Sequence, residues 1–312
     1  MTNQATTKWS SERIAMLKSM RENGLTYMEC AKSLDVSYDS VEKKSRVLGL
    51  TDKDLGPKTK HVPVDNAESV VKRSHPTERV MYPDKFEIKG SGNVLVIGDT
   101  HIPFERNGYM EHCQRVRDQY NCTKIVHIGD EVDLHAISYH EHDPDGYSAG
   151  QEFDIAAERL RKWYSAFPEV VLTMGNHSDL PRRKARTNGL PQWLVKSYSE
   201  IWKAPPGWTW CITAEKDGVL YKHGDGYGGN YPMANAVINE RQSCVIGHLH
   251  SVSGIWYDAT RKDLLFGLSV GSGIDPNSYA MQYAAHSRSR PILSCAVVFD
   301  GGKQAIIEPM EI

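Results

Sequence analysis

The feature that most constrains this chain is a set of short apolar runs, each ending in a glycine followed by a metal-competent residue. These runs and endings are Val94–Ile97 with Gly98-Asp99, Lys124–Ile128 with Gly129-Asp130, and Val170–Met174 with Gly175-Asn176. Short runs rich in Val and Ile, separated by stretches with helical spacing, predict a layered α/β domain. In such folds ligands gather beyond the carboxyl ends of the strands.

Further strands and helices are expected along the same part of the chain. The expected strands are Val219–Lys222, Cys244–Ile246, Leu264–Leu268 and Ile292–Phe299, and the expected helices are Tyr109–Tyr120, Glu152–Phe167 and Met233–Arg241. We therefore expect one α/β domain over residues 91–312.

The first fifty residues predict a small all-helical module. Expected helices run from Ser11 to Met20, from Tyr27 to Leu34 and from Tyr38 to Leu48. The last two resemble a helix-turn-helix, with core positions Ala31, Leu34, Val36 and Val41, which would make the module a DNA-binding element. The alternative is a helical bundle or dimerisation arm, so homo-oligomers are also expected. Residues 51–90 are polar, contain four prolines and predict a linker.

Charge and cysteine usage exclude several classes of protein. The formal net charge is -2, so the whole chain offers no general attraction for nucleic acid. Six scattered cysteines without a C-x-x-C pair are typical of a reduced, cytoplasmic protein. The first residues lack a signal-peptide pattern, and no apolar run is long enough to span a membrane. We expect a cytoplasmic protein without membrane contact.

Five polar blocks carry the chemistry. In chain order they are Asp99-Thr-His101, Asp130-Glu-Val-Asp133, Asn176-His177, His223, and His248-Leu-His250. Carboxylates together with imidazoles suit divalent manganese, iron, nickel or zinc. Two such ions need a ligand that reaches both, and the two oxygens of a carboxylate can do this. Asp130 is the natural bridge.

The order of these blocks resembles the calcineurin-like metallophosphoesterase superfamily, with its pattern D-x-H, G-D-x-x-D, G-N-H, H and G-H-x-H, over about residues 91–312. The resemblance implies a layered αββα sandwich and two divalent metal ions, manganese first, with iron, nickel, zinc or magnesium as alternatives. It implies that Asp99, His101 and His250 hold one ion. Asn176, His223 and His248 would hold the other, and Asp130 would bridge them.

The same resemblance implies the reaction. A bridging water, its pKa lowered by two cations, would attack phosphorus in line. His177 would face the phosphate and stabilise charge or protonate the leaving oxygen. We expect His177 and Asp133 to be the catalytic residues. The sequence of residues 140–154 also resembles that of metallophosphoesterases from bacteriophages and prophages. This resemblance implies that the protein acts in the cytoplasm of a host.

Three departures from the family pattern stand out. Ser178 follows His177, where an acid is usual, so the orientation of His177 is open. Leu134 and His135 follow Asp133, where many members carry an arginine. Four cations also follow the third block, and they suit either a phosphate clamp or a solvated helix face; they are Arg182, Arg183, Lys184 and Arg186.

The sequence supports three hypotheses of function. The leading one is a metal-dependent phosphoesterase acting on phosphodiesters, with nucleic acid as a candidate substrate. The second is a phosphomonoesterase for small molecules or phosphoproteins. The third, from another class, is a DNA-binding regulator with an inactive phosphoesterase fold, which a missing ligand would favour. Every ligand position is occupied, so we predict an enzyme.

Overall fold

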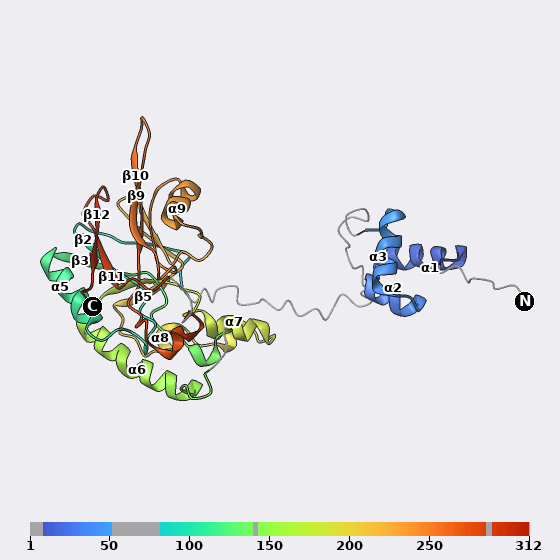
Figure 1. Cartoon of the computed structure of the whole chain (residues 1–312), viewed down its shortest axis with the longest axis horizontal. Coiled ribbons are helices and arrows are strands. Elements are labelled where there is room, and N and C mark those ends of the chain that lie inside the picture. The colour runs from blue at the N-terminus through green and yellow to red at the C-terminus, as the bar shows by residue number, and fades with distance from the viewer. Residues whose placement is uncertain (1–8, 52–81, 140–142, 285–288, 312) are drawn as a thin grey trace, which may run out of the picture. The chain divides into compact units, whose positions relative to one another are not determined.

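The computed structural model describes residues 9–51, 82–139, 143–284 and 289–311. The chain divides into two units, Met1–His75 and Pro76–Ile312. Figure 1 shows helices in the first unit and both helices and strands in the second. No helix among the described residues has the length and apolarity needed to cross a membrane.

The first unit is built from α1 (Ser11–Glu22), α2 (Tyr27–Leu34) and α3 (Tyr38–Val47). Thr26 and Glu29 form a reciprocal cap at the start of α2, which satisfies backbone N–H groups that would otherwise lack partners. The three helices pack on a small core of their own, formed by Leu17, Cys30, Ala31, Leu34 and Val41. Val36, expected in this core, is only partly buried.

The second unit contains two six-stranded sheets. Sheet A holds, in spatial order, β1 (Lys85–Glu87), β6 (Thr213–Lys216), β7 (Val219–Lys222), β8 (Ser243–Ile246), β10 (Leu264–Val270) and β9 (Ser253–Ala259). Sheet B holds β12 (Ala305–Pro309), β11 (Ser294–Val298), β2 (Asn93–Ile97), β3 (Cys122–His127), β4 (Val170–Thr173) and β5 (Trp208–Cys211).

Helices cover the outer faces of the two sheets (Figure 1). The helices of this unit are α5 (Tyr109–Gln119), α6 (Ala149–Ala166), α7 (Leu180–Thr187), α8 (Tyr198–Ile201) and α9 (Pro232–Glu240), with the short turns η1 (His135–Ile137), η2 (Gln192–Leu194) and η3 (Tyr279–Ala284). Helices α5, α6 and α8 pack on sheet B, whereas α9 packs on sheet A. One apolar cluster lies between sheet B and its helices and a second between sheet A and α9. A third fills the space between the two sheets. This is the layered αββα sandwich expected from the sequence.

The expected linker needs one correction. Most of residues 51–90 lies outside the described residues, but Lys85–Glu87 forms β1 and pairs in parallel with β6. The sequence did not predict this strand, because the stretch is polar. A three-residue strand at a sheet edge needs little apolar surface. A folded strand therefore precedes residue 91.

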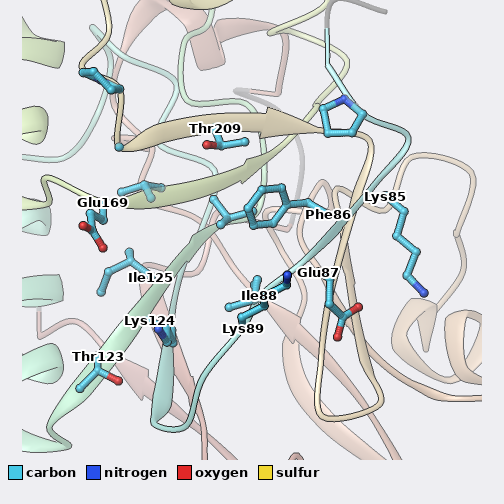
Figure 2. A pocket seen from close by; sticks show the side chains of 15 residues that line it. Lys85, Phe86, Glu87, Ile88, Lys89, Thr123, Lys124, Ile125, Glu169 and Thr209 are labelled. Carbon is cyan, nitrogen blue, oxygen red and sulfur yellow. The ribbon is translucent and has the colours of Figure 1, made fainter.

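A cavity of about 650 Å³ opens between β1 and the first residues of β3, β4 and β5 (Figure 2). Phe86 points into it, and Lys124 and Thr209 line its wall. It lies at the amino ends of β3 and β4, whereas the polar blocks follow the carboxyl ends of these strands.

Candidate metal centre

The five polar blocks follow five strands at one edge of the two sheets. Asp99, Asp130 and Asn176 follow β2, β3 and β4, which are parallel neighbours in sheet B. His223 and His248 follow β7 and β8, which are parallel neighbours in sheet A. The carboxyl ends of parallel neighbours share an edge, so the sequence blocks converge in space.

Glycines of some blocks make room for side chains of others. A Cβ atom on Gly175 would clash with the carboxylate of Asp130, and one on Gly247 would clash with that of Asp99. A Cβ atom on Gly129 would likewise meet the ring of His223. These glycines are required by close approach between blocks, in addition to any role in turning the chain.

The first cluster contains Asp99, His101 and His250, whose candidate ligand atoms lie within 4.8 Å of one another. Nδ1 of His101 lies 2.5 Å from Oδ1 of Asp133, an acceptor, so Nδ1 carries the proton and Nε2 keeps a lone pair. That Nε2 faces Nε2 of His250 at 3.0 Å. Nε2 of His250 in turn lies 3.3 Å from Oδ2 of Asp99.

The second cluster contains Asp130, His223 and His248, with Asn176 beside it. Nδ1 of His223 lies 3.1 Å from the carbonyl oxygen of Ile128, which places the ring proton there. Nε2 of His223 then faces three further atoms. They are Oδ2 of Asp130 at 3.1 Å, Oδ1 of Asn176 at 3.1 Å and Nδ1 of His248 at 3.2 Å.

The Asp130 carboxylate lies between the two clusters. Its Oδ1 accepts the backbone N–H groups of His177 at 2.8 Å and Ser178 at 3.3 Å. Its Oδ2 lies 3.1 Å from Nε2 of His223 and 3.9 Å from Nε2 of His101. One oxygen is thus held by the backbone while the other is directed toward both clusters.

The arrangement fits divalent cations. Oδ1 of Asp99 is buried and has no hydrogen-bond partner among the residues that the structure describes. In both clusters acceptor atoms point at one another, which is unfavourable unless a proton or a metal ion lies between them. Burial lowers the pKa of His223, but the attraction of Asp130 and Asp99 outweighs it and raises that pKa to about 10. A positive charge is therefore favoured at this position.

His177 lies beside the first cluster, with its ring centroid 4.7 Å from that of His101. Its Nδ1 donates to the carbonyl oxygen of Asp133 at 2.7 Å and lies 3.3 Å from Oδ1 of that residue. Burial lowers the pKa of His177, but Asp133 and Asp130 raise it to about 9. The ring is partly exposed, and its raised pKa favours the protonated form at neutral pH. His177 also forms a third candidate metal cluster with His101 and Asp133.

Comparison with known proteins decides the family. The model of the family described as "Calcineurin-like phosphoesterase" matches residues 92–266, which is more than half of the chain. This chain belongs to the calcineurin-like phosphoesterase family. It is accordingly a metal-dependent hydrolase of phosphate esters, and its Asp and His clusters could hold the metals. No curated protein matches the sequence.

Several solved structures resemble the chain at low identity. Vacuolar Protein Sorting 29 from Cryptosporidium parvum is 10% identical, with a TM-score of 0.37, and the match covers 72% of this chain and 100% of the other. The phosphoesterase Yfce from E. coli is 15% identical, with a TM-score of 0.32, covering 66% and 87%. The nuclease MPE from Pseudomonas putida is 13% identical, with a TM-score of 0.29, covering 70% and 87%.

Ser178, which stands where the family pattern has an acid, is held by Glu131, a residue that the sequence alone did not single out. The Glu131 carboxylate is fully buried and accepts hydrogen bonds from Oγ of Ser178 and from Nε1 of Trp210, the latter at 3.1 Å. Burial raises the pKa of Glu131 to about 7. The sequence signal for this role was the position of Glu131, directly after Asp130 at the end of an apolar run. A carboxyl group buried at such a position needs polar partners.

The cations of α7 are largely engaged within this phosphoesterase. Nη1 of Arg183 donates to the carbonyl oxygen of Asn176 at 2.9 Å, and Nζ of Lys184 donates to that of Ser138 at 3.0 Å. Nε of Arg182 lies 3.4 Å from Asp179. Arg186 is exposed. Arg183 thus braces the loop that carries Asn176 rather than extending freely into solvent.

The structure brings all nine predicted site residues to one place. The seven predicted ligands, Asp99, His101, Asp130, Asn176, His223, His248 and His250, lie in the two clusters described above, and Asp133 and His177 lie beside them. Trp202, Trp208 and Trp210 are buried in the core, as the packing interpretation expects. The individual roles of the nine stay predictions.

Proposed function

We propose that this phosphoesterase hydrolyses phosphodiesters at a two-metal centre. Asp99, His101 and His250 would hold one divalent ion, and Asn176, His223 and His248 the other. The observation that carries this proposal is the position of Asp130, whose Oδ2 lies 3.1 Å from Nε2 of His223 and 3.9 Å from Nε2 of His101. Such a shared carboxylate is what a pair of ions requires.

Two bound divalent ions would supply Lewis acidity, lowering the pKa of a water molecule and drawing charge from the phosphoryl oxygens. We assign His177 the role of general acid. With a pKa near 9 it carries a proton at neutral pH, which it can donate to the leaving oxygen as the phosphorus–oxygen bond breaks. The carbonyl and carboxylate of Asp133 hold the ring in position.

A diester is favoured over a monoester by the charges around the site. A monoester carries more negative charge and profits from guanidinium groups close to the metals. Leu134 and His135 stand where many family members have an arginine. Arg182 pairs with Asp179, and Arg183 is engaged by the backbone carbonyl oxygen of Asn176. A singly charged diester needs fewer cations, so it suits this site better.

A substrate panel tests the proposal. The full chain in manganese is assayed with bis(p-nitrophenyl) phosphate and with p-nitrophenyl phosphate, which release the same chromophore. We expect the diester to be the better substrate by kcat/KM, and Asp130→Asn to abolish its hydrolysis. Preference for the monoester would favour the alternative of a phosphomonoesterase, and inactivity toward both would favour a DNA-binding regulator with an inactive fold.

We propose further that the first unit binds DNA and that the second unit is a separate catalytic module. Supporting this, α3 exposes Tyr38, Lys43 and Arg46 on a helix that follows a tight turn at Asp35. Fluorescence anisotropy with labelled duplex DNA tests it, using Lys43→Glu as the variant. Unchanged affinity in that variant, together with a dimer in light scattering, would support the dimerisation arm instead.

A further inference from the structure

A group of aromatic side chains lies beside the metal centre and is not used by the reaction. Three of them form what we call the aromatic shelf: Phe104, Tyr147 and Tyr279. The rings of Phe104 and Tyr279 meet edge to face with centroids 4.9 Å apart. The rings of Phe104 and Tyr147 are nearly parallel, at 15°, with centroids 6.3 Å apart. Tyr147 and Tyr279 meet edge to face at 5.7 Å.

Backbone hydrogen bonds hold the residues of the shelf, and one of them joins it to the loop of His101. The N–H of Phe104 donates to the carbonyl oxygen of His101 at 2.7 Å, and the carbonyl oxygen of Phe104 accepts from the N–H of Asp275 at 2.7 Å. The N–H of Tyr147 donates to the hydroxyl of Tyr279 at 3.0 Å. The rings are therefore preorganised relative to the site.

The shelf combines one buried ring with one exposed ring. Phe104 is only 6% exposed and packs with Ile274, Ala280 and Met281 in a small apolar cluster separate from the main cores. Tyr147, in contrast, is 43% exposed. An aromatic side chain that is partly exposed and packs on an apolar cluster is suited to stacking a flat group of a ligand.

His135 connects the shelf to the chemistry. Its ring centroid lies 5.6 Å from that of Tyr279 and 6.5 Å from that of Phe104, while its Nδ1 lies 3.8 Å from Oδ2 of Asp133. One buried side chain thus separates the shelf from Asp133. A group bound on the shelf would therefore lie near the metal centre without adjoining it, so a ligand that reaches both needs a spacer between its two groups.

We propose that the aromatic shelf binds the base of a nucleoside whose phosphodiester is cleaved at the metal centre. This inference rests on the proposed function and names its substrate class. The shelf supplies flat aromatic surface, which every nucleobase can stack on. The sugar supplies the spacer, since it separates the base from the phosphate. An aryl phosphate, in which the ring is attached directly to the phosphate oxygen, lacks this spacer and fits the arrangement less well.

Two diesters with the same leaving group test the proposal. Thymidine 5′-(p-nitrophenyl phosphate) carries a base, and methyl p-nitrophenyl phosphate does not. We expect Tyr147→Ala to lower the ratio of their kcat/KM values, nucleoside ester over methyl ester, by roughly tenfold, mainly through a higher KM for the nucleoside ester. Tyr147→Phe retains the ring and should preserve the ratio. Tyr257→Ala removes an exposed tyrosine on β9 and serves as the matched control.

A binding measurement provides a second readout. Titration calorimetry with thymidine 5′-monophosphate, phenyl phosphate and methyl phosphate should show tighter binding of the nucleotide to the wild-type chain, lost in Tyr147→Ala. If Tyr147→Ala leaves the ratio of the two kcat/KM values unchanged, or lowers both values equally, the shelf does not bind the nucleoside ester. A loss confined to phenyl phosphate would overturn the nucleobase assignment. If the wild-type chain hydrolyses neither diester, the proposed function fails, whereas the calorimetry still reports on the shelf.

Discussion

Three residues of the metal centre have an unusual backbone conformation. His101, Asp130 and His248 all have positive φ, at 49°, 49° and 66°. For residues with a Cβ atom this region costs about 1–3 kcal/mol each and persists only where the surroundings enforce it. Hydrogen bonds from His101 N to the carbonyl oxygen of Asp130, and from His248 N to the Asp99 carboxylate, enforce it here. Part of the conformational cost of the fold thus arises where the predicted ligands converge.

His177→Ala separates catalysis from metal binding. Because His177 is assigned as the proton donor and not as a ligand, the variant should keep its metal content. Its kcat on a diester should fall by roughly 10²–10⁴-fold. Metal analysis and steady-state kinetics on the same preparation check this. Loss of metal would instead assign His177 to the candidate cluster with His101 and Asp133.

Glu131→Gln tests the buried carboxyl behind Ser178. Burial raises the pKa of Glu131 from 4.5 to about 7, so the folded chain binds a proton more tightly than the unfolded chain. Stability then falls as pH rises from 4.5 to about 7 and is level above that range. The shift corresponds to roughly 3 kcal/mol.

Denaturant unfolding in the presence of a chelator, from pH 4.5 to 8, measures this contribution. The wild-type chain should lose more unfolding free energy across the window than Glu131→Gln does. Glu152, whose pKa burial also raises to about 7, contributes to both proteins and cancels in the comparison. Parallel curves for the two proteins would show that Glu131 does not titrate in this range.

At the scale of elements, the carboxyl ends of strands β2, β3, β4, β7 and β8 determine the site. Gly175→Ala tests this placement, because the added Cβ would clash with the carboxylate that Asp130 directs at both clusters. We expect bound metal and activity to be lost together. Gly150→Ala in α6 is the matched control, since a Cβ there meets nothing within 4 Å and alanine favours a helix. Full metal content in Gly175→Ala would contradict the close approach.

The sequence predicts the buried strands better than the edge strands. The runs that became β2, β4, β7 and β8 are mostly buried, because helices or the second sheet cover them, and β3 is buried over its last two residues. The strands missed include β1, β9 and β12, which lie at sheet edges and carry polar residues. The sequence analysis interpreted Trp208 and Trp210 as packing residues and did not predict the strand β5 that contains them.

The candidate ligands were predictable because each follows a buried strand directly. The bracing residues were not, because they depend on contacts between blocks that are distant in the sequence. Glu131 meets Ser178, 47 residues away, and Trp210, 79 residues away. The aromatic shelf likewise joins residues 104, 147 and 279, and no local pattern predicts that contact.

At the scale of the whole molecule, the two units have separate cores. The helical unit packs on Leu17 and its neighbours, and the metal centre lies entirely within the second unit. Each unit thus has its own apolar interior, as expected of modules with separate tasks. All nine predicted site residues belong to the second unit.

The metal content of the purified full-length chain tests the central claim most directly. Equilibrium dialysis against manganese, followed by elemental analysis, should give two ions per chain for the wild-type protein. Asp130→Asn should bind fewer, because it replaces the carboxylate directed at both clusters. One ion or none in the wild-type chain, or two retained in Asp130→Asn, would contradict a centre bridged by Asp130.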